Sequence, residues 1–130
     1  MSDPIEPKGD LTLRTLAMPA DANPNGDIFG GWVMAQMDLS AGMRASERAA
    51  GRVATVAVKE MHFRLPVRVG DTLCIYTTVL GVGRSSITLD VEVWARRARS
   101  TAREKVTEAV FVMVAIDDDG KTRPVDPVVA

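Results

Sequence analysis

The stretch DANPNGDIFGGWVMAQMDLSAGM, residues 21–43, decides the fold and carries one isolated carboxylate, Asp38. Its first half is rich in turn-forming residues, and Gly30 and Gly31 then lead into an apolar segment that is typical of a helix. An ionised carboxylate in apolar surroundings costs several kcal/mol unless it is paired or hydrogen-bonded. Folding stability alone gives little reason to keep such a group, so we interpret Asp38 as a candidate general base.

The composition of the 130-residue chain predicts a single domain, residues 1–130, with tails at 1–10 and 125–130. Sixteen basic residues against 17 acidic ones give a net charge of −1, which argues against a general nucleic-acid binder. Cys74 is the only cysteine, and no apolar run reaches the roughly 20 residues of a membrane span. We therefore expect a cytoplasmic protein without a membrane span.

Five segments rich in Val, Ile, Thr and aromatic residues predict strands at 11–18, 53–65, 71–80, 85–97 and 105–117. A helix is expected from Gly30 or Gly31 to about Ala50, stopped by Gly51. Because the connections PVRVGD and GVGR are short, we expect the last four strands to pair as an antiparallel meander. The predicted fold class is α+β, with one long central helix wrapped by a five-stranded antiparallel sheet. The last strand is apolar on both faces (AVFVMVAI), which predicts association between chains.

Three segments together resemble the hotdog-fold acyl-CoA thioesterases, and most of all their bacterial broad-specificity acyl-CoA hydrolase branch. They are LRTLAMPADANPNGDIFGGWVMAQMD (13–38), VATVAVKEMHFRLPVRVGD (53–71) and GRSSITLDVEVW (83–94). The resemblance covers roughly residues 11–124, and the fifteen-residue spacing from Asn23 to Asp38 is its most specific feature. It implies a hotdog fold, hydrolysis of acyl-CoA thioesters without a metal or other cofactor, and a dimer that often assembles into a hexamer.

The resemblance also implies roles for single residues, in sites that draw on both chains of a dimer. It places the catalytic carboxylate at Asp38, main-chain donors at Gly30 and Gly31, and a site asparagine, contributed by the partner subunit, at Asn23. Thr55 matches a position beside the reacting carboxylate. The chemistry agrees, because amides at a helix N-terminus carry partial positive charge and suit an oxyanion hole. Asp38 would act either as a general base or as a nucleophile that forms a mixed anhydride, and both routes stay open.

Each of these residues also has a purely structural interpretation. Asn23 can form an Asx turn before Pro24, and Gly30 and Gly31 can serve a tight turn or a close approach of helix and sheet. Thr55 is a residue that strands favour. The alternative function is a non-catalytic acyl-CoA-binding hotdog module, although binding alone would not need a carboxylate in the helix.

The coenzyme A part of such a substrate needs positive charge and hydrogen-bond donors. Arg84, Ser85 and Ser86 are the first candidates, because they lie at a predicted turn where hydroxyl and amide groups can meet phosphate oxygens. Arg96 and Arg97, at the start of the basic run RRARSTAREK, are the second. A polar hairpin end and a solvated loop are the corresponding structural alternatives.

Other chemistries find no support in the sequence. His62 is the only histidine and has no cysteine near it, so we expect no zinc site. Cys74 lies in an apolar strand segment, where it is most simply a small buried hydrophobe. The sequence contains no GxSxG elbow, no P-loop and no GxGxxG motif after a strand. Trp32, Met34 and Met37 flank Asp38 and are candidates for the lining of an acyl tunnel.

Overall fold

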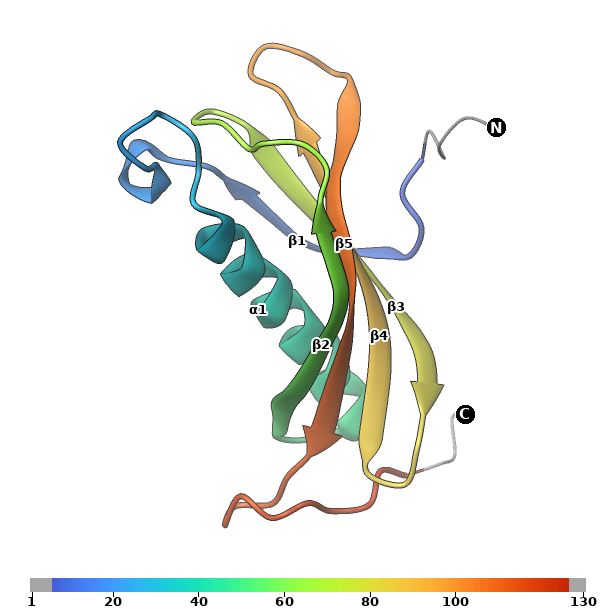
Figure 1. Cartoon of the computed structure of the whole chain (residues 1–130). Helices are drawn as coiled ribbons and strands as arrows, with labels where there is room; N and C mark the ends of the chain where they lie inside the picture. Colours follow the sequence, from blue (N-terminus) through green and yellow to red (C-terminus); the bar gives the residue numbers. More distant parts are fainter. Residues whose placement is uncertain (1–5, 127–130) are drawn as a thin grey trace.

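The computed structural model describes residues 6–126, which form one antiparallel sheet and one long helix (Figure 1). The elements are β1 Asp10–Leu16, the short 3-10 helix η1 Pro19–Asp21, α1 Gly30–Ala49, β2 Val53–Phe63, β3 Thr72–Val82, β4 Ser86–Arg96 and β5 Arg103–Ala115. The strand order is β1-β3-β4-β5-β2, and every neighbouring pair is antiparallel. The predicted α+β architecture is confirmed.

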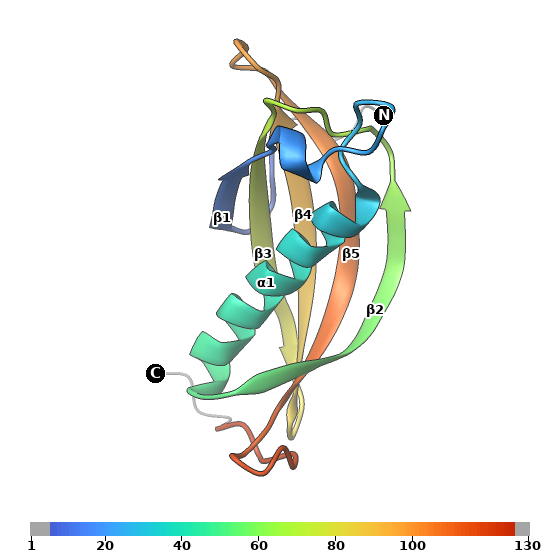
Figure 2. The same cartoon turned by 90° about the vertical axis from the view of Figure 1, so that its left-hand side faces the viewer.

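Helix α1 lies across the concave face of the sheet, which curves around it (Figure 2). Its buried apolar residues recur every four positions and so share one face of the helix. They are Val33, Met37, Ala41, Ala45 and Ala49. The helix ends where the sequence predicts, because Ala50 adopts a left-handed conformation and the Gly51 amide donates to Ser46 O at 3.2 Å.

The sheet separates a core face from an outer face by simple alternation along each strand. In β4, the residues that face α1 are fully buried in the core, namely Ile87, Leu89, Val91 and Val93. The intervening residues, among them Asp90 and Glu92, alternate with them and so face away from α1. One face of the sheet therefore packs against the helix, and the other face carries charged side chains.

The predicted strand pairing is correct for β3, β4 and β5 but wrong for β2. β2 does not pair with β3, its successor in the chain, and lies instead at the sheet edge beside β5. The connection at 64–71 makes this possible, because eight extended residues span about 26 Å whereas three strand spacings need only about 14 Å. Two backbone bonds, Ala17 N to Asp71 O and Ile28 N to Val67 O, hold it over the end of the sheet. A short connection limits how far apart two successive strands can lie, but it does not require them to be neighbours in the sheet.

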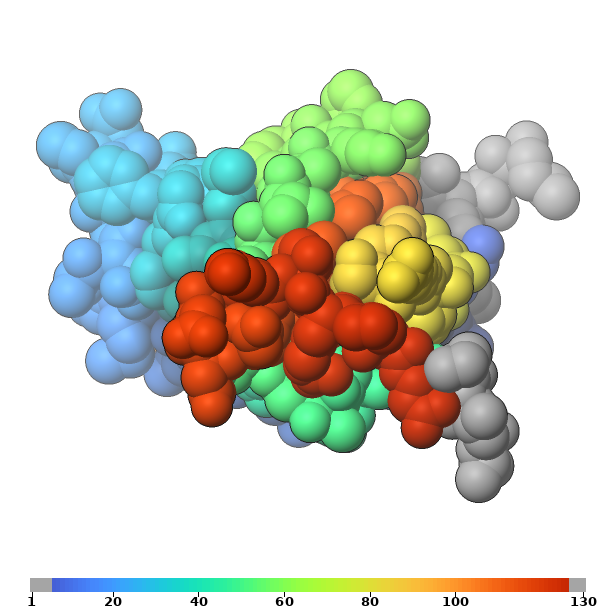
Figure 3. Space-filling view, turned by 90° about the horizontal axis from the view of Figure 1, so that it is seen from below, coloured from blue at the N-terminus to red at the C-terminus, as the bar shows by residue number. Residues whose placement is uncertain are grey.

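The segment after β5 folds back against the end of α1, next to the β3–β4 hairpin (Figure 3). Arg123 donates to Ala49 O at 2.8 Å, so a cation closes the carbonyl end of the helix. Val125, which the sequence assigns to a tail, is only 4% exposed and belongs to the core. At the other end, Asp10 already belongs to β1 and the Lys8 amide donates to Glu92 Oε1, so the predicted tail 1–10 is partly held in the fold. Residues 1–5 and 127–130 of the two predicted tails lie outside the described residues. No helix in residues 6–126 combines the length and apolar character that crossing a membrane requires.

Candidate active site

Asp38 and Thr55 meet between the helix and the edge strand. Asp38 lies midway along α1, and Thr55 on β2 donates its hydroxyl to Asp38 Oδ1 at 2.5 Å. The sequence predicts apolar surroundings for Asp38, and its neighbours on this flank, Met34, Leu39 and Met43, are indeed apolar. These three side chains are 39–53% exposed, however, and Asp38 itself is exposed in the single chain. The chain's own sheet leaves this flank of the helix uncovered.

A groove of about 440 Å³ runs along this flank and contains the carboxylate. Its lining includes Asp38, Thr55, Gly42, Met43, Met113 and Arg52. The walls near the carboxylate are apolar, and Gly42 leaves room above the Met113 methyl group, which would lie 3.7 Å from a Cβ at this position. The groove can therefore hold an apolar chain beside a charged oxygen.

A second cluster lies at the start of α1. The first amides to bond within the helix are those of Trp32 and Val33, which both donate to Phe29 O. Within residues 6–126 the amides of Gly30 and Gly31 make no hydrogen bond. The reason is that a helical amide bonds the carbonyl four residues earlier, and for the first turn those residues lie outside the helix. A Cβ on Gly31 would meet nothing within 4 Å, and one on Gly30 would meet only the Phe63 ring, at 3.7 Å. Two positively polarised donors are thus open to an approaching oxygen.

Asn23 lies in the loop that enters α1, where its amide donates to Asp27 O at 2.7 Å. Its side-chain oxygen accepts from the amides of Asn25, at 2.9 Å, and Asp27, at 3.1 Å. The Asx turn that the sequence allows is therefore formed, and the side-chain NH2 is the group left to bind a ligand. The loop is fixed to the helix start because Phe29 N donates to Asp21 O at 3.1 Å. At the helix start, a pocket of about 350 Å³ is lined by Gly30 together with Phe63 and the connection after β2.

The two clusters are too far apart to act together within one chain. Gly30 and Asp38 are eight residues apart on α1, which corresponds to about 12 Å along the helix axis. The carbonyl oxygen must lie about 3 Å from an oxyanion donor while the attacking water lies about 3 Å from the general base, and both of these oxygens bond to the same carbon. The single chain therefore brings Asp38 together with Thr55 and keeps both apart from the amides of Gly30 and Gly31, while Asn23 lies opposite Asp27 in the loop before the helix.

Comparison with known proteins identifies the family. The family model of the Thioesterase superfamily matches residues 25–102. This chain belongs to the Thioesterase superfamily. The acyl-CoA thioester hydrolase YciA of Salmonella typhimurium is 53% identical over 121 residues, which are 91% of each chain. The resemblance that the sequence analysis draws is thus confirmed.

Solved structures of related thioesterases have the same fold. The hexameric thioesterase y2039 of Yersinia pestis is 52% identical, with a TM-score of 0.91 over 95% of this chain and 100% of that one. HI0827, a hexameric broad-specificity acyl-coenzyme A thioesterase, was solved as a variant with an aspartate replaced by alanine. It is also 52% identical, with a TM-score of 0.89 over 92% of this chain and 88% of that one. The hotdog fold of this thioesterase is therefore established.

The first candidates for coenzyme A binding lie at the far end of α1 from Gly30. Arg84, Ser85 and Ser86 form the tip of the β3–β4 hairpin, as predicted, and Gly83 N donates to Ser86 O at 2.8 Å. Main-chain bonds from Ala115 to Ser85 O and from Val125 to Arg84 O attach the tip to the segment after β5. Both serines are half-buried and Arg84 is exposed. Their role toward coenzyme A stays a prediction.

Arg96 and Arg97 lie at the opposite end of the sheet, where β4 ends. Arg97 donates to Asp71, to Glu104 at 3.0 Å and to Pro66 O at 3.0 Å, so it joins the connection between β2 and β3 to the start of β5. Partial burial acts to lower the pKa of Arg97, but its hydrogen bonds to Glu104 and Asp71 raise it overall. Arg97 is thus a structural cation in this thioesterase, and neither arginine joins the Asp38 cluster. Their role in binding coenzyme A also stays a prediction.

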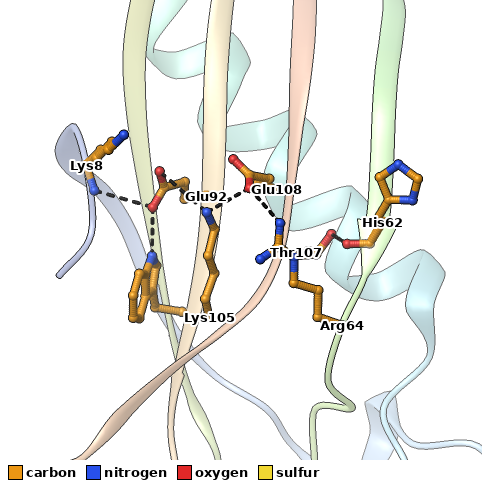
Figure 4. A network of polar contacts seen from close by, with 8 residues as sticks. Lys8, His62, Arg64, Glu92, Lys105, Thr107 and Glu108 are labelled. Atoms are coloured by element: carbon orange, nitrogen blue, oxygen red, sulfur yellow. Dashed lines mark hydrogen bonds and ion pairs between the residues drawn. The ribbon is translucent and has the colours of Figure 1, made fainter. Parts of the chain in front are cut away.

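Arg52, which lines the groove of Asp38, was not predicted from the sequence. The available signal was its position between the helix and β2, three residues before Thr55. A cluster on the outer face was not predicted either; there, carboxylate oxygens of Asp90, Glu92 and Glu108 lie within 4.8 Å of one another. Lys105 is placed among them, with Nζ 2.7 Å from Glu108 Oε1 (Figure 4). Burial raises the pKa of Asp90, and the charges of Glu108 and Glu92 add to this effect.

Proposed function

We propose that this thioesterase hydrolyses acyl-CoA thioesters to the free acid and coenzyme A, with Asp38 acting at the reacting carbonyl. The observation that carries the proposal is the carboxylate of Asp38, held by Thr55 inside a largely apolar groove. The relatives named above are acyl-CoA thioester hydrolases, which supports the substrate class. In this proposal the reaction uses water and no metal or other cofactor, and coenzyme A enters as part of the substrate. The single cysteine, Cys74, favours the reducing cytoplasm as its compartment.

The geometry of Asp38 suits proton transfer. Thr55 occupies Oδ1 and fixes the orientation of the carboxylate, whereas Oδ2 has no hydrogen bond within residues 6–126. Oδ2 can accept a proton from a water molecule that attacks the thioester carbonyl, and a positioned base contributes about 10²- to 10⁴-fold to such a rate. The same oxygen can instead attack the carbonyl carbon and form a mixed anhydride, as the C–S bond breaks and coenzyme A leaves as its thiolate; water then cleaves the anhydride to the free acid and the Asp38 carboxylate.

A dimer would complete the site. β2 is an edge strand on which Val56 and Val58 are 57% and 42% exposed, and such an edge favours pairing with another chain. If two β2 strands pair antiparallel about a two-fold axis, the start of one lies beside the end of the other. Phe63 ends β2 and packs against Gly30, so the helix start of one subunit would reach the groove of Asp38 in its partner. The oxyanion donors and the carboxylate then belong to different chains, which removes the separation of about 12 Å.

We extend the proposal to a hexamer of three such dimers, because y2039 and HI0827 are hexameric. The outer face of the sheet offers apolar surface for a second interface. Val110, Val112 and Val114 of β5 are only half-buried there. This arrangement would use both faces of the final strand, which accords with its apolar sequence.

The test of the function is thiol release from acyl-CoAs with short to long acyl chains. We expect turnover by the wild type and a loss of about 10²- to 10⁴-fold in kcat for Asp38→Asn, with acyl-CoA binding retained. Asp90→Asn, which changes a carboxylate on the outer face, is the matched control and should keep full activity. Binding without turnover in the wild type would favour the non-catalytic module, and equal activity of Asp38→Asn would refute the mechanism.

The shared site is tested by complementation between two inactive variants. Asp38→Asn removes the carboxylate, and Gly30→Val obstructs the amide donors of the other cluster. When the two are refolded together, each mixed dimer has one site with both defects and one intact site, so about one quarter of all sites should recover. No recovery would mean that each site is built from a single chain.

A further inference from the structure

Arg52 is the cationic residue among those that line the groove of Asp38 and Thr55. It immediately precedes β2, and three residues along an extended chain separate it from Thr55 by about 10 Å. The guanidinium is not within ion-pair distance of Asp38. One groove therefore presents a carboxylate at one point and a cation farther along.

The guanidinium of Arg52 is held by neutral groups. Its Nη1 donates to Asp117 O at 3.2 Å and to Asp118 O at 3.3 Å. The carboxylate of Asp117 is not used for this purpose, because Oδ1 accepts the amides of Asp119 and Lys121 within its own turn. Arginine has five N–H donors, and the three on Nε and Nη2 make no hydrogen bond within residues 6–126.

Among the described arginines that have no ion pair, Arg52 is the one that lines the groove of Asp38. Arg44 pairs with Asp10, Arg64 with Glu108, and Arg97 with two carboxylates. In the part of the chain that the structure describes, Arg52 has no carboxylate within ion-pair distance. A guanidinium fixed on one side and open on the other is suited to bind an oxyanion with two parallel hydrogen bonds.

We infer that Arg52 binds an anionic group of the substrate at the end of the Asp38 groove. This inference rests on the proposed function and names a residue that the reaction chemistry itself does not require. Two parts of an acyl-CoA can supply an oxyanion at a distance from the reacting carbonyl, namely the phosphates of coenzyme A and a carboxylate at the far end of a dicarboxylic acyl chain. The apolar walls around Gly42, Met43 and Met113 would hold the uncharged segment in between.

The test compares wild type and Arg52→Gln, which removes the charge but keeps a polar side chain of similar reach. Arg14→Gln is the matched control, because Arg14 is an exposed arginine on β1, at the opposite edge of the sheet from β2. Each protein is assayed by thiol release from hexanoyl-CoA, hexanoyl-pantetheine and adipyl-pantetheine. A lost charge-assisted hydrogen bond should raise KM by about tenfold or more, while kcat changes by less than about twofold.

The three substrates separate the two sources of the anion. If Arg52 binds a phosphate, Arg52→Gln is impaired on hexanoyl-CoA and normal on both pantetheine esters. If it binds a distal carboxylate, Arg52→Gln is impaired on adipyl-pantetheine alone. Equal KM values for wild type and variant on all three substrates, or equal impairment on all three, would overturn the inference and leave the proposed function intact. Absence of thiol release by the wild type would refute the proposed function, and the inference with it.

A structural role for Arg52 is separated from binding by a second variant and a second measurement. Arg52→Lys retains the charge and should recover part of the loss in KM, and the KM of the wild type should rise with salt more steeply than that of Arg52→Gln. Unfolding curves of the variants measure how much the hydrogen bonds of Arg52 to Asp117 O and Asp118 O contribute to the free energy of unfolding. If Arg52→Gln does not fold, Arg52→Lys and the salt dependence decide alone, and a KM that is insensitive to salt would refute the inference.

Discussion

Asp38 and Glu92 are carboxylates on opposite faces of the molecule, and their surroundings differ sharply. Asp38 is exposed in the single chain, accepts one hydrogen bond and lies in an open groove. Glu92 is 3% exposed and accepts hydrogen bonds from Trp94 Nε1 at 2.9 Å and from the Lys8 amide at 3.3 Å (Figure 4). Lys105 Nζ lies 3.9 Å from its second oxygen.

The comparison teaches that burial alone does not identify the reactive carboxylate. Glu92 is deep in the protein, yet both of its oxygens have partners, so it stabilises the fold and has little to offer a substrate. Asp38 keeps one oxygen without a partner within residues 6–126 and has space in front of it. An unused oxygen beside a groove is the better indicator of chemistry in this molecule.

The largest expected effect is on stability and separates the two carboxylates. Glu92→Ala leaves the Trp94 and Lys8 donors without their acceptor and Lys105 without one of its two counter-ions, and should lower the free energy of unfolding by about 3–5 kcal/mol. Asp38→Asn should change it by less than about 0.5 kcal/mol. Urea denaturation followed by circular dichroism measures both values. Similar values for the two variants would remove the distinction between a structural and a reactive carboxylate.

A smaller effect concerns the single hydrogen bond that orients Asp38. Thr55→Val keeps the shape of the side chain but removes the donor, and should lower kcat about tenfold, as expected for a lost hydrogen bond to a charged group. Thr55→Ser retains the hydroxyl and should recover most of the activity. Thiol-release assays on proteins with equal unfolding midpoints provide the measurement. Normal activity of Thr55→Val would assign Thr55 to strand formation alone.

The smallest effect lies in the outer-face cluster and depends on pH. Burial, and then the charges of Glu108 and Glu92, raise the pKa of Asp90 against the attraction of Lys105 and Lys8. Between the ordinary pKa of 3.8 and the raised one, the folded state binds more protons than the unfolded state, so stability falls as pH rises through this window.

Asp90→Asn removes this cost of ionisation and should therefore stabilise the protein at neutral pH. Because Asp90 is partly exposed, we expect the gain to be below about 1 kcal/mol. The gain should vanish below pH 3.8, where the carboxyl group is neutral in both states. Urea midpoints at the two pH values measure it, and an equal gain at both would show that charge is not its cause.

Local patterns in the sequence predicted much of the fold. The helix ends were predicted correctly because the signals that mark them act over a few residues: Gly30 and Gly31 begin the helix, and Gly51 follows the left-handed residue Ala50. The strands were found from their composition, and Asp38 with Thr55 from the family resemblance. The position of β2 was wrong, because neighbours in a sheet are chosen by long-range packing that the length of a connection does not report.

The sequence by itself determined the elements, the family and the types of residue available for chemistry, because each of these depends on neighbouring residues or on a contiguous motif. Only the tertiary structure decided which charged groups are satisfied and which are open. It joined Arg97 to Asp71 and Glu104, left Arg52 without a counter-ion within residues 6–126, and placed the Thr55 hydroxyl within hydrogen-bond distance of Asp38. These outcomes depend on distances between residues far apart in the chain, and such distances are set only when the sheet closes around the helix.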